Sequence, residues 1–306
     1  MAAIVVEGLT KIYGSLRAVD GASFAVERGE VFGLLGPNGA GKTTTVEILV
    51  GLRQQDGGKV SVLGFDPCTH AKEFKAKIGV QLQQVALYPR LTVTETVALF
   101  ASFYPQSLAP VEVIKRVGLA EKAHTQAKDL SGGQRQRLAI ALTMVGDGEV
   151  VFLAEPTTGL DPQARRGVWE LIGDLKARGK TVFLTTHYME EAERLCDRVA
   201  VMDHGRIIAL DSPQALIDRH FIERAVEFTS PVLAGDEGLR SLPGVTRLQA
   251  NDEEGAVTIY TTDVGRTVDA LMRHAAAHRA PLENLVVRQA SLEDVFLKLT
   301  GRRIGE

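Results

Sequence analysis

The sequence predicts an α/β fold with a largely parallel sheet, followed by a smaller α+β domain. Residues 31–36 (VFGLLG) are continuously apolar, as expected for a strand buried on both faces of a sheet, and a glycine-rich turn connects them to a helix. Strands and helices then alternate as far as about Asp211, which is typical of parallel strands joined by crossover helices. Beyond that point, a half-exposed strand at residues 256–263 and an amphipathic helix indicate a second domain.

Length and composition limit the possible functions. A chain of 306 residues accommodates one domain of about 200–250 residues and a small additional one. The net charge of −3 argues against general nucleic-acid binding, because such domains are usually basic. Cys68 and Cys196 lack metal-site spacing and favour free thiols in a reducing, cytosolic setting. No apolar run approaches the roughly 20 residues that span a bilayer, so we expect a chain that docks on a membrane at most.

The N-terminal part contains the first predicted strands and the first predicted helix. Residues Ile4–Val6 and Ala22–Val26 are expected to form short strands, with turn residues between them. Residues 42–52 suit a helix that packs its apolar side chains, Leu52 among them, on the sheet.

The middle of the chain contains a helical block from Thr92 to Lys128, in which Thr92 and Glu95 have the spacing of a capping box. A domain boundary is expected within Asp211–Arg219. It divides the chain into residues 1–215, with a helical subdomain at about 86–145, and residues 216–306. The other expected elements are strands at 150–153, 181–187, 198–203, 206–211, 256–263 and 283–290, and helices at 162–179, 188–196, 266–278 and 292–301.

The glycine-rich turn carries a phosphate-binding motif, GPNGAGKTT. Gly39 and Gly41 allow backbone N–H groups to converge on phosphate oxygens, and the helix that begins here directs its positive end at the anion. Lys42 adds a positive charge for the β- and γ-phosphates, and the Thr43 hydroxyl can ligate Mg²⁺. The motif predicts a nucleoside-triphosphate site that consists of Gly36, Pro37, Asn38, Gly39, Ala40, Gly41, Lys42, Thr43 and Thr44.

A second glycine motif, LSGGQRQRL at residues 130–138, lies where another helix is expected to begin. Its backbone amides would form a second anion-binding helix N-terminus. Together with the phosphate loop, this motif resembles the signature of ABC-type ATPases, and the resemblance extends through most of Ala2–Asp211. It implies the ABC ATPase fold, with a mixed sheet and a helical subdomain. It also implies a head-to-tail dimer, in which one subunit contacts the ATP of the other through Ser131, Gly132, Gly133 and Gln134.

The resemblance also implies residues that contact the base and the metal ion. Tyr13 matches the aromatic residue that stacks on adenine, although a lone tyrosine also suits a protein core. Gln83 matches the glutamine that reaches Mg²⁺ and the attacking water. That assignment depends on register, because Gln81 and Gln84 are close by. The implied cofactors are ATP and Mg²⁺.

Three further positions match catalytic or interface residues of the family. Glu155 matches the carboxylate that polarises the attacking water, and His187 matches the histidine that contacts the γ-phosphate, although a lone histidine is often structural. Asp161 matches the loop that crosses to the other subunit's site.

The chain departs from the family at Ala154, where an aspartate usually helps to hold Mg²⁺. We therefore expect ATP binding and dimerisation, with slow or no hydrolysis at this chain's own site. Two explanations for Ala154 stay open: a natural degenerate subunit whose intact signature completes a partner's working site, or a substitution introduced into a normal ATPase. The otherwise intact site favours the second.

The C-terminal segment at residues 291–302 (SLEDVFLKLTGR) resembles the extension of ATPase subunits from prokaryotic two-component exporters, the drug-resistance type above all. A generic accessory domain is the alternative. The resemblance implies separate integral-membrane permease subunits, which dock at roughly residues 86–103, a second copy or a homologous ATPase subunit, and a location at the cytoplasmic face of the membrane.

Other ABC functions fit less well. DNA-repair ATPases carry a long coiled coil between the two glycine motifs, whereas Lys42 and Ser131 are only 89 positions apart (131 − 42) with no heptads. Translation-factor ABC proteins carry two cassettes in one chain. A non-catalytic nucleotide sensor is supported only by Ala154.

Overall fold

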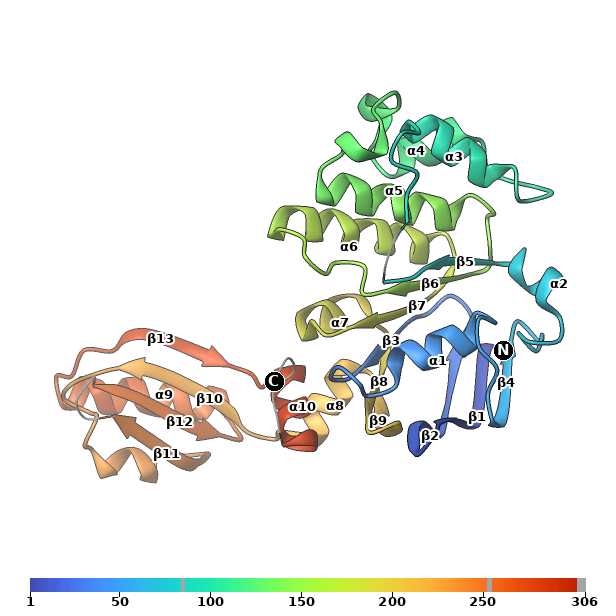
Figure 1. Ribbon diagram of the computed structural model, residues 1–306. Coiled ribbons are helices and arrows are strands. Elements are labelled where there is room, and N and C mark those ends of the chain that lie inside the picture. The colour runs from blue at the N-terminus through green and yellow to red at the C-terminus, as the bar shows by residue number, and fades with distance from the viewer. Residues whose placement is uncertain (84–85, 252–254, 302–306) are drawn as a thin grey trace. The chain divides into compact units, whose positions relative to one another are not determined.

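The computed structural model describes residues 1–83, 86–251 and 255–301 (Figure 1). Its largest sheet has six strands in the order β5-β6-β7-β3-β8-β9. Neighbouring strands from β5 to β8 are parallel, and only the β8–β9 pair is antiparallel. The fold is therefore α/β with a mixed sheet, as predicted. The strands are β3 (Val31–Leu35), β5 (Ile78–Gln81), β6 (Val150–Ala154), β7 (Thr181–Thr186), β8 (Arg198–Asp203) and β9 (Arg206–Asp211).

A second, antiparallel sheet has the order β2-β1-β4, with β1 at Ala2–Tyr13, β2 at Leu16–Glu27 and β4 at Gly57–Val62. The prediction of short strands was wrong here, because β1 and β2 run for 12 residues each. Several register shifts between them interrupt the alternation of polar and apolar residues that would have revealed the full strands. Phe24 of β2 stacks on Phe32 of β3 with ring centroids 5.5 Å apart, which joins the two sheets.

The phosphate-loop helix α1 (Lys42–Leu49) is shorter than predicted. Gly51 adopts a positive φ of 70°, which turns the chain after the helix. Leu52 is consequently 54% exposed, so the prediction that it packs on the sheet was wrong. Other helices connect or cover the strands: α2 (Ala71–Lys75), α6 (Pro162–Ala177) and α7 (Met189–Leu195).

The predicted helical block contains α3 (Val93–Ala101) and α4 (Pro110–Arg116), followed by two 3₁₀ turns, η1 (Ala120–Lys122) and η2 (Ala127–Asp129), and by α5 (Gly132–Met144). The predicted capping box is confirmed: the Thr92 hydroxyl accepts from the Glu95 N–H, and the Glu95 carboxylate accepts from the Thr92 N–H.

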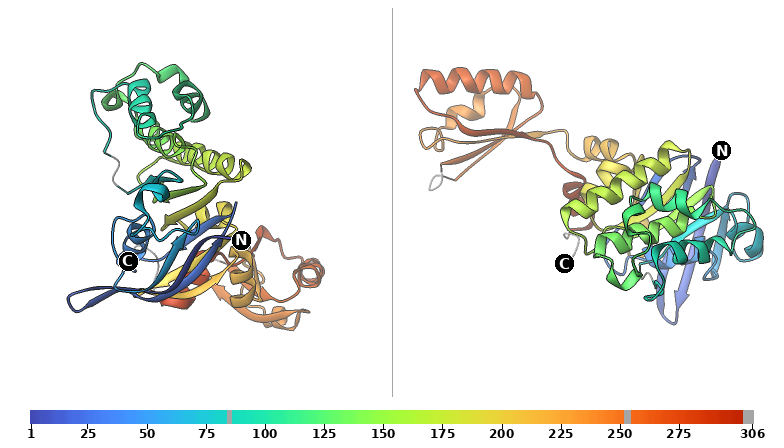
Figure 2. Two further views of the ribbon diagram at one scale, coloured as in Figure 1. Left: turned by 90° about the vertical axis from the view of Figure 1, so that its right-hand side faces the viewer. Right: turned by 90° about the horizontal axis from the view of Figure 1, so that it is seen from above.

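Contacts divide the chain into two compact units, Met1–Pro213 together with the chain from Leu299 onward, and Gln214–Lys298. The second unit contains an antiparallel sheet of order β11-β12-β10-β13, against which α9 packs (Figure 2). The succession strand, 3₁₀ turn, strand, strand, helix, strand gives this sheet a ferredoxin-like topology. Its elements are β10 (Arg224–Thr229), η3 (Glu237–Ser241), β11 (Val245–Asn251), β12 (Ala256–Thr261), α9 (Val264–Ala277) and β13 (Glu283–Arg288), flanked by α8 (Pro213–His220) and α10 (Leu292–Thr300).

Candidate functional site

The phosphate loop connects β3 to α1, with Gly41 as the residue before the helix. Gly41 has a φ of +106°, and a Cβ atom there would lie 2.3 Å from the Ala18 carbonyl oxygen. Gly39 has a φ of +80° with no heavy atom within 4 Å of a Cβ position, so space would remain in front of the loop. The two glycines therefore place no side chain of their own between the backbone N–H groups at the start of α1 and an approaching anion.

Lys42 lies beneath the loop and is only 6% exposed. Its ammonium group donates to the carbonyl oxygens of Gly36 at 2.7 Å and Pro37 at 2.9 Å. Burial lowers the pKa of Lys42, and the nearby Glu155 carboxylate opposes this shift. The side chain is thus held at the loop by its own backbone, where an anion could replace the two carbonyl oxygens.

Glu155 contacts three side chains, two of which are distant in the sequence. It follows the last residue of β6 with a φ of +49°, an uncommon conformation for a residue with a side chain. Its Oε2 atom accepts from Gln83 Nε2 at 3.2 Å and from Thr158 Oγ1 at 3.2 Å, and lies 3.5 Å from His187 Nδ1. The carboxylate is therefore fixed by side chains that approach from the end of β5, from the following loop and from the end of β7.

A cavity of about 240 Å³ lies between α1 and the ends of the sheet strands. Thr43 of α1, Gln83 and Glu155 supply polar atoms to it. Ala154, the last residue of β6, supplies a methyl group where a longer polar side chain would enter the cavity. Its full lining is Thr43, Val46, Glu47, Leu82, Gln83, Ala154, Glu155 and Thr185.

The glutamines near the end of β5 differ in their surroundings. Gln81 is the last residue of β5 and only 4% exposed, whereas Gln83 is exposed and bonded to Glu155. Gln84 lies outside the described residues. Of the two described glutamines, only Gln83 lines the cavity beside Ala154.

The signature residues lie at the start of α5. Ser131 is its N-cap and forms a capping box with Gln134, which accepts from the Ser131 N–H at 2.9 Å. Gly133 packs so closely on α6 that a Cβ atom would lie 2.7 Å from the Ala164 side chain. Asp161 caps α6 by accepting from the Ala164 N–H at 2.9 Å. Ser131, Gly132, Gly133 and Asp161 line one open cavity of about 790 Å³, which the phosphate loop does not reach.

Tyr13, at the end of β1, is 38% exposed. Its ring is flanked by Lys11 Nζ and Arg53 Cζ, at 5.6 and 5.7 Å from the centroid. Arg53 also forms an ion pair with Glu47, one of the cavity residues. The exposed ring fits a stacking surface for a base better than it fits a place in the core.

Sequence reasoning missed two residues next to this site. Thr158, in the TTGLD segment, contacts Glu155. Glu191 of α7 is completely buried and accepts from Trp169 Nε1 at 2.9 Å. Burial raises the pKa of Glu191, whereas Thr186 and Thr157 favour its ionised form. Glu191 could have been found from the sequence by its position, since it lies four residues after His187 on the helix that follows.

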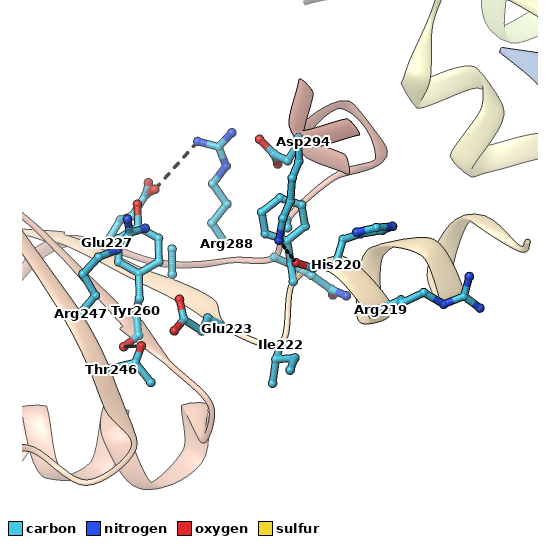
Figure 3. Close-up of a pocket in the computed structure, with 15 residues that line it drawn as sticks. Arg219, His220, Ile222, Glu223, Glu227, Thr246, Arg247, Tyr260, Arg288 and Asp294 are labelled. Atoms are coloured by element: carbon cyan, nitrogen blue, oxygen red, sulfur yellow. Dashed lines mark hydrogen bonds and ion pairs between the residues drawn. The ribbon is translucent and has the colours of Figure 1, made fainter. Parts of the chain in front are cut away.

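The C-terminal unit has a larger cavity, of about 870 Å³ (Figure 3). Several of its charged groups have partners within the unit: Arg247 lies over the Tyr260 ring at 3.8 Å, Arg288 lies 3.9 Å from Glu227, and Lys298 donates to the His220 carbonyl. None of the residues predicted for nucleotide binding lines this cavity. Among the described residues, no helix is long and apolar enough to cross a bilayer.

The amino-acid sequence was compared with known protein families and with curated proteins. The family described as "ABC transporter" matches residues 19–158, and "Nodulation factor export protein NodI, C-terminal domain" matches residues 251–301. The chain is 42% identical to the Nod factor export ATP-binding protein I of Ralstonia nicotianae, over 98% of this chain and 94% of that protein. The corresponding protein of Paraburkholderia xenovorans is 41% identical, over 100% and 99%.

Solved structures agree with this placement. The structure of an ATP-binding subunit of an ABC transporter aligns with a TM-score of 0.65 and 28% identity, over 71% of this chain and 92% of that one. A dimeric ATP-binding cassette in a post-hydrolysis state with ADP and Pi aligns with a TM-score of 0.62 and 27% identity, over 68% and 98%. The chain therefore belongs to the ATP-binding subunits of ABC transporters, among the exporter-type homologues of Nod factor export ATP-binding protein I.

Proposed function

We propose that this ABC ATPase subunit binds Mg·ATP, closes head-to-tail on a second ATPase subunit and drives export through a separate permease, while its own site hydrolyses ATP slowly. Subunits of this family bind and hydrolyse ATP, dimerise and work with a membrane permease. The observation that carries the proposal is the Ala154 methyl group in the cavity beside Thr43, Gln83 and Glu155.

The phosphate loop fits ATP. The open space in front of Gly39, the start of α1 and the buried ammonium group of Lys42 together form an anion-binding cradle. Phosphate oxygens would replace the carbonyl oxygens of Gly36 and Pro37 as acceptors for Lys42. The exposed ring of Tyr13 supports its assignment to the adenine base.

The cavity beside the loop fits Mg²⁺ only in part. Mg²⁺ prefers oxygen ligands, and Thr43 and Gln83 can supply a hydroxyl and an amide oxygen. Ala154 supplies none, so the nucleotide phosphates and solvent would complete the shell. When bound, Mg²⁺ neutralises charge on the transferred phosphoryl group.

We assign the remaining catalytic work to three side chains. Glu155 Oε2 would accept the proton of the attacking water. Gln83 donates to this carboxylate from one side, and His187 approaches it from another, so both can orient the water and the γ-phosphate. In this proposal the three side chains are in place, and the absent group is the carboxylate that would help to fix the metal ion.

The dimer, the permease and the cargo are assigned from the same family membership. We propose that Ser131, Gly132, Gly133, Gln134 and Asp161, at the surface of this chain, meet the ATP of the second subunit. We place the complex on the cytoplasmic face of the membrane, with the permease at about residues 86–103. Because the relatives are named for Nod factor export, we infer an exported cargo of that class rather than a drug.

A second candidate is a degenerate subunit of a heterodimer, and one observation favours it. The signature helix of this chain keeps its complete capping box although the chain's own site lacks the metal-side aspartate. In that case, the signature serves a hydrolysing partner subunit.

Light scattering after size-exclusion chromatography, with and without Mg·ATP, tests the proposal. We expect ATP to convert the purified chain from monomer to dimer, and we expect Lys42→Ala to remain monomeric, because it lacks the phosphate contact. A monomer at saturating ATP would contradict the homodimer, and dimerisation only after addition of a homologous subunit would establish the second candidate.

A further inference from the structure

We propose that Asp236, His274 and His278 form a divalent metal site in the C-terminal unit, with Zn²⁺ as the best-suited ion. One possible ligand atom from each of the three side chains lies within 4.8 Å of the other two. None of these residues belongs to the ATP site, and the inference does not depend on the proposed function.

Two structural elements hold the three side chains together. His274 and His278 are four residues apart at the end of α9, so they lie on the same side of the helix, with ring centroids 4.3 Å apart. Asp236 lies directly before η3, where its carboxylate accepts from the Gly238 N–H at 2.7 Å.

The core of the unit fixes both elements. Leu271 and Ala275 of α9 pack with Leu239 of η3 in the same apolar cluster. The candidate ligands therefore project from a packed helix and from an adjacent capped turn, so metal binding would need little ordering of the backbone.

The donor set suits zinc. Imidazole nitrogen and carboxylate oxygen bind Zn²⁺ at about 2.0–2.2 Å, so two tetrahedral ligand atoms are about 3.3 Å apart. Asp236 Oδ2 and His274 Nε2 are 2.6 Å apart in a hydrogen bond, so these two atoms must separate slightly as the ion replaces the shared proton. The other pairs must approach by up to about 1.5 Å, the difference between 4.8 and about 3.3 Å.

Side-chain rotation can provide this adjustment. His278 is exposed, and its Nδ1 lies 2.9 Å from the carbonyl oxygen of His274 in its own helix. His274 and Asp236 are about one fifth and one quarter exposed, so an ion can reach them from solvent.

A bound ion would connect η3 to α9. Because an ion that binds only the folded state stabilises it by mass action, Zn²⁺ should raise the melting temperature of the C-terminal unit. The site has three protein ligands and leaves a fourth position for water.

Isothermal titration calorimetry of the metal-free full chain with ZnCl₂, without nucleotide, tests the site. We expect one Zn²⁺ per chain to bind through these residues. The variant His278→Ala removes a ligand and leaves both partners of the Asp236–His274 hydrogen bond in the chain, and it should weaken binding by at least about 10-fold. His204→Ala is the matched control, because His204 is an exposed histidine of the other unit, with 83% of its side chain accessible, and should bind like the parent.

A second variant separates metal binding from folding. Asp236→Asn keeps a side-chain acceptor for the Gly238 N–H and removes the charged ligand. It should lose zinc affinity and the zinc-dependent rise in melting temperature while its metal-free melting temperature stays close to that of the parent. Zinc affinity equal to the parent's in both His278→Ala and Asp236→Asn would overturn the proposal, as would the absence of zinc binding by the parent.

Discussion

Replacing Ala154 by aspartate should accelerate ATP hydrolysis at this chain's own site. Ala154 ends β6, pairs with Thr185 of β7 and lines the cavity that also contains Thr43 and Gln83. The cavity of about 240 Å³ has room for one added carboxylate, and residue 154 is partly exposed, so the new charge stays in contact with water.

The expected rate gain follows from restoring the carboxylate that would help to hold Mg²⁺. A group that hydrogen-bonds to a ligand of a metal ion typically contributes about 10–100-fold in metal affinity or activity. This corresponds to about 1.4–2.7 kcal/mol of barrier. The gain should be largest at low Mg²⁺ concentration, because excess Mg²⁺ compensates in part for a weakened site.

The assay is steady-state phosphate release at saturating ATP over a range of Mg²⁺ concentrations. Glu155→Gln in the Ala154→Asp background is the control, and it should abolish the gain because it removes the proposed base. Equal rates for the parent chain and Ala154→Asp at every Mg²⁺ concentration, with ATP bound by both, would refute the reasoning.

Two further predictions concern the loop and a buried acid. Gly41→Ala should lower the free energy of unfolding by about 1–3 kcal/mol and abolish ATP binding, because its Cβ atom would meet the Ala18 carbonyl at a positive φ. Urea unfolding measures the change in stability. Gly173→Ala in α6 is the matched control and should be neutral or stabilising, because a Cβ atom there meets nothing within 4 Å. Because burial raises the pKa of Glu191, the folded state holds the carboxyl proton of Glu191 more tightly than the unfolded chain does. The contribution of Glu191 to the free energy of unfolding therefore falls as the pH rises above about 4.5, the ordinary pKa of this side chain. Glu191→Gln should therefore gain stability relative to the parent at pH 8 compared with pH 5, and a pH-independent difference would contradict this assignment.

Local patterns in the sequence were sufficient for much of the fold. The strand at residues 31–36 is entirely apolar because β3 is covered on both faces, and the glycine motifs predicted where α1 and α5 begin. The strands β4, β5, β10 and β11 were missed, since they are short, partly exposed or rich in polar residues. Their positions depend on pairing with distant strands, which no local pattern encodes.

The contacts within the candidate site could not be predicted from local sequence patterns either. The sequence motifs indicated Glu155 and Gln83 separately, but the hydrogen bond between them joins residues 72 positions apart. Thr158 contacts the same carboxylate, and Glu155 has a positive φ, neither of which the sequence reveals. The absence of a carboxylate at Ala154, in contrast, was visible from the sequence alone.

The nucleotide retained in the closed dimer tests the central claim most directly. The dimer formed by the parent chain with Mg·ATP would be isolated by rapid gel filtration, and its bound nucleotide quantified by chromatography after denaturation. We predict mostly ATP in the parent dimer and mostly ADP, or rapid return to monomer, for Ala154→Asp. A parent dimer that contains mainly ADP would contradict the claim that Ala154 stalls hydrolysis after closure.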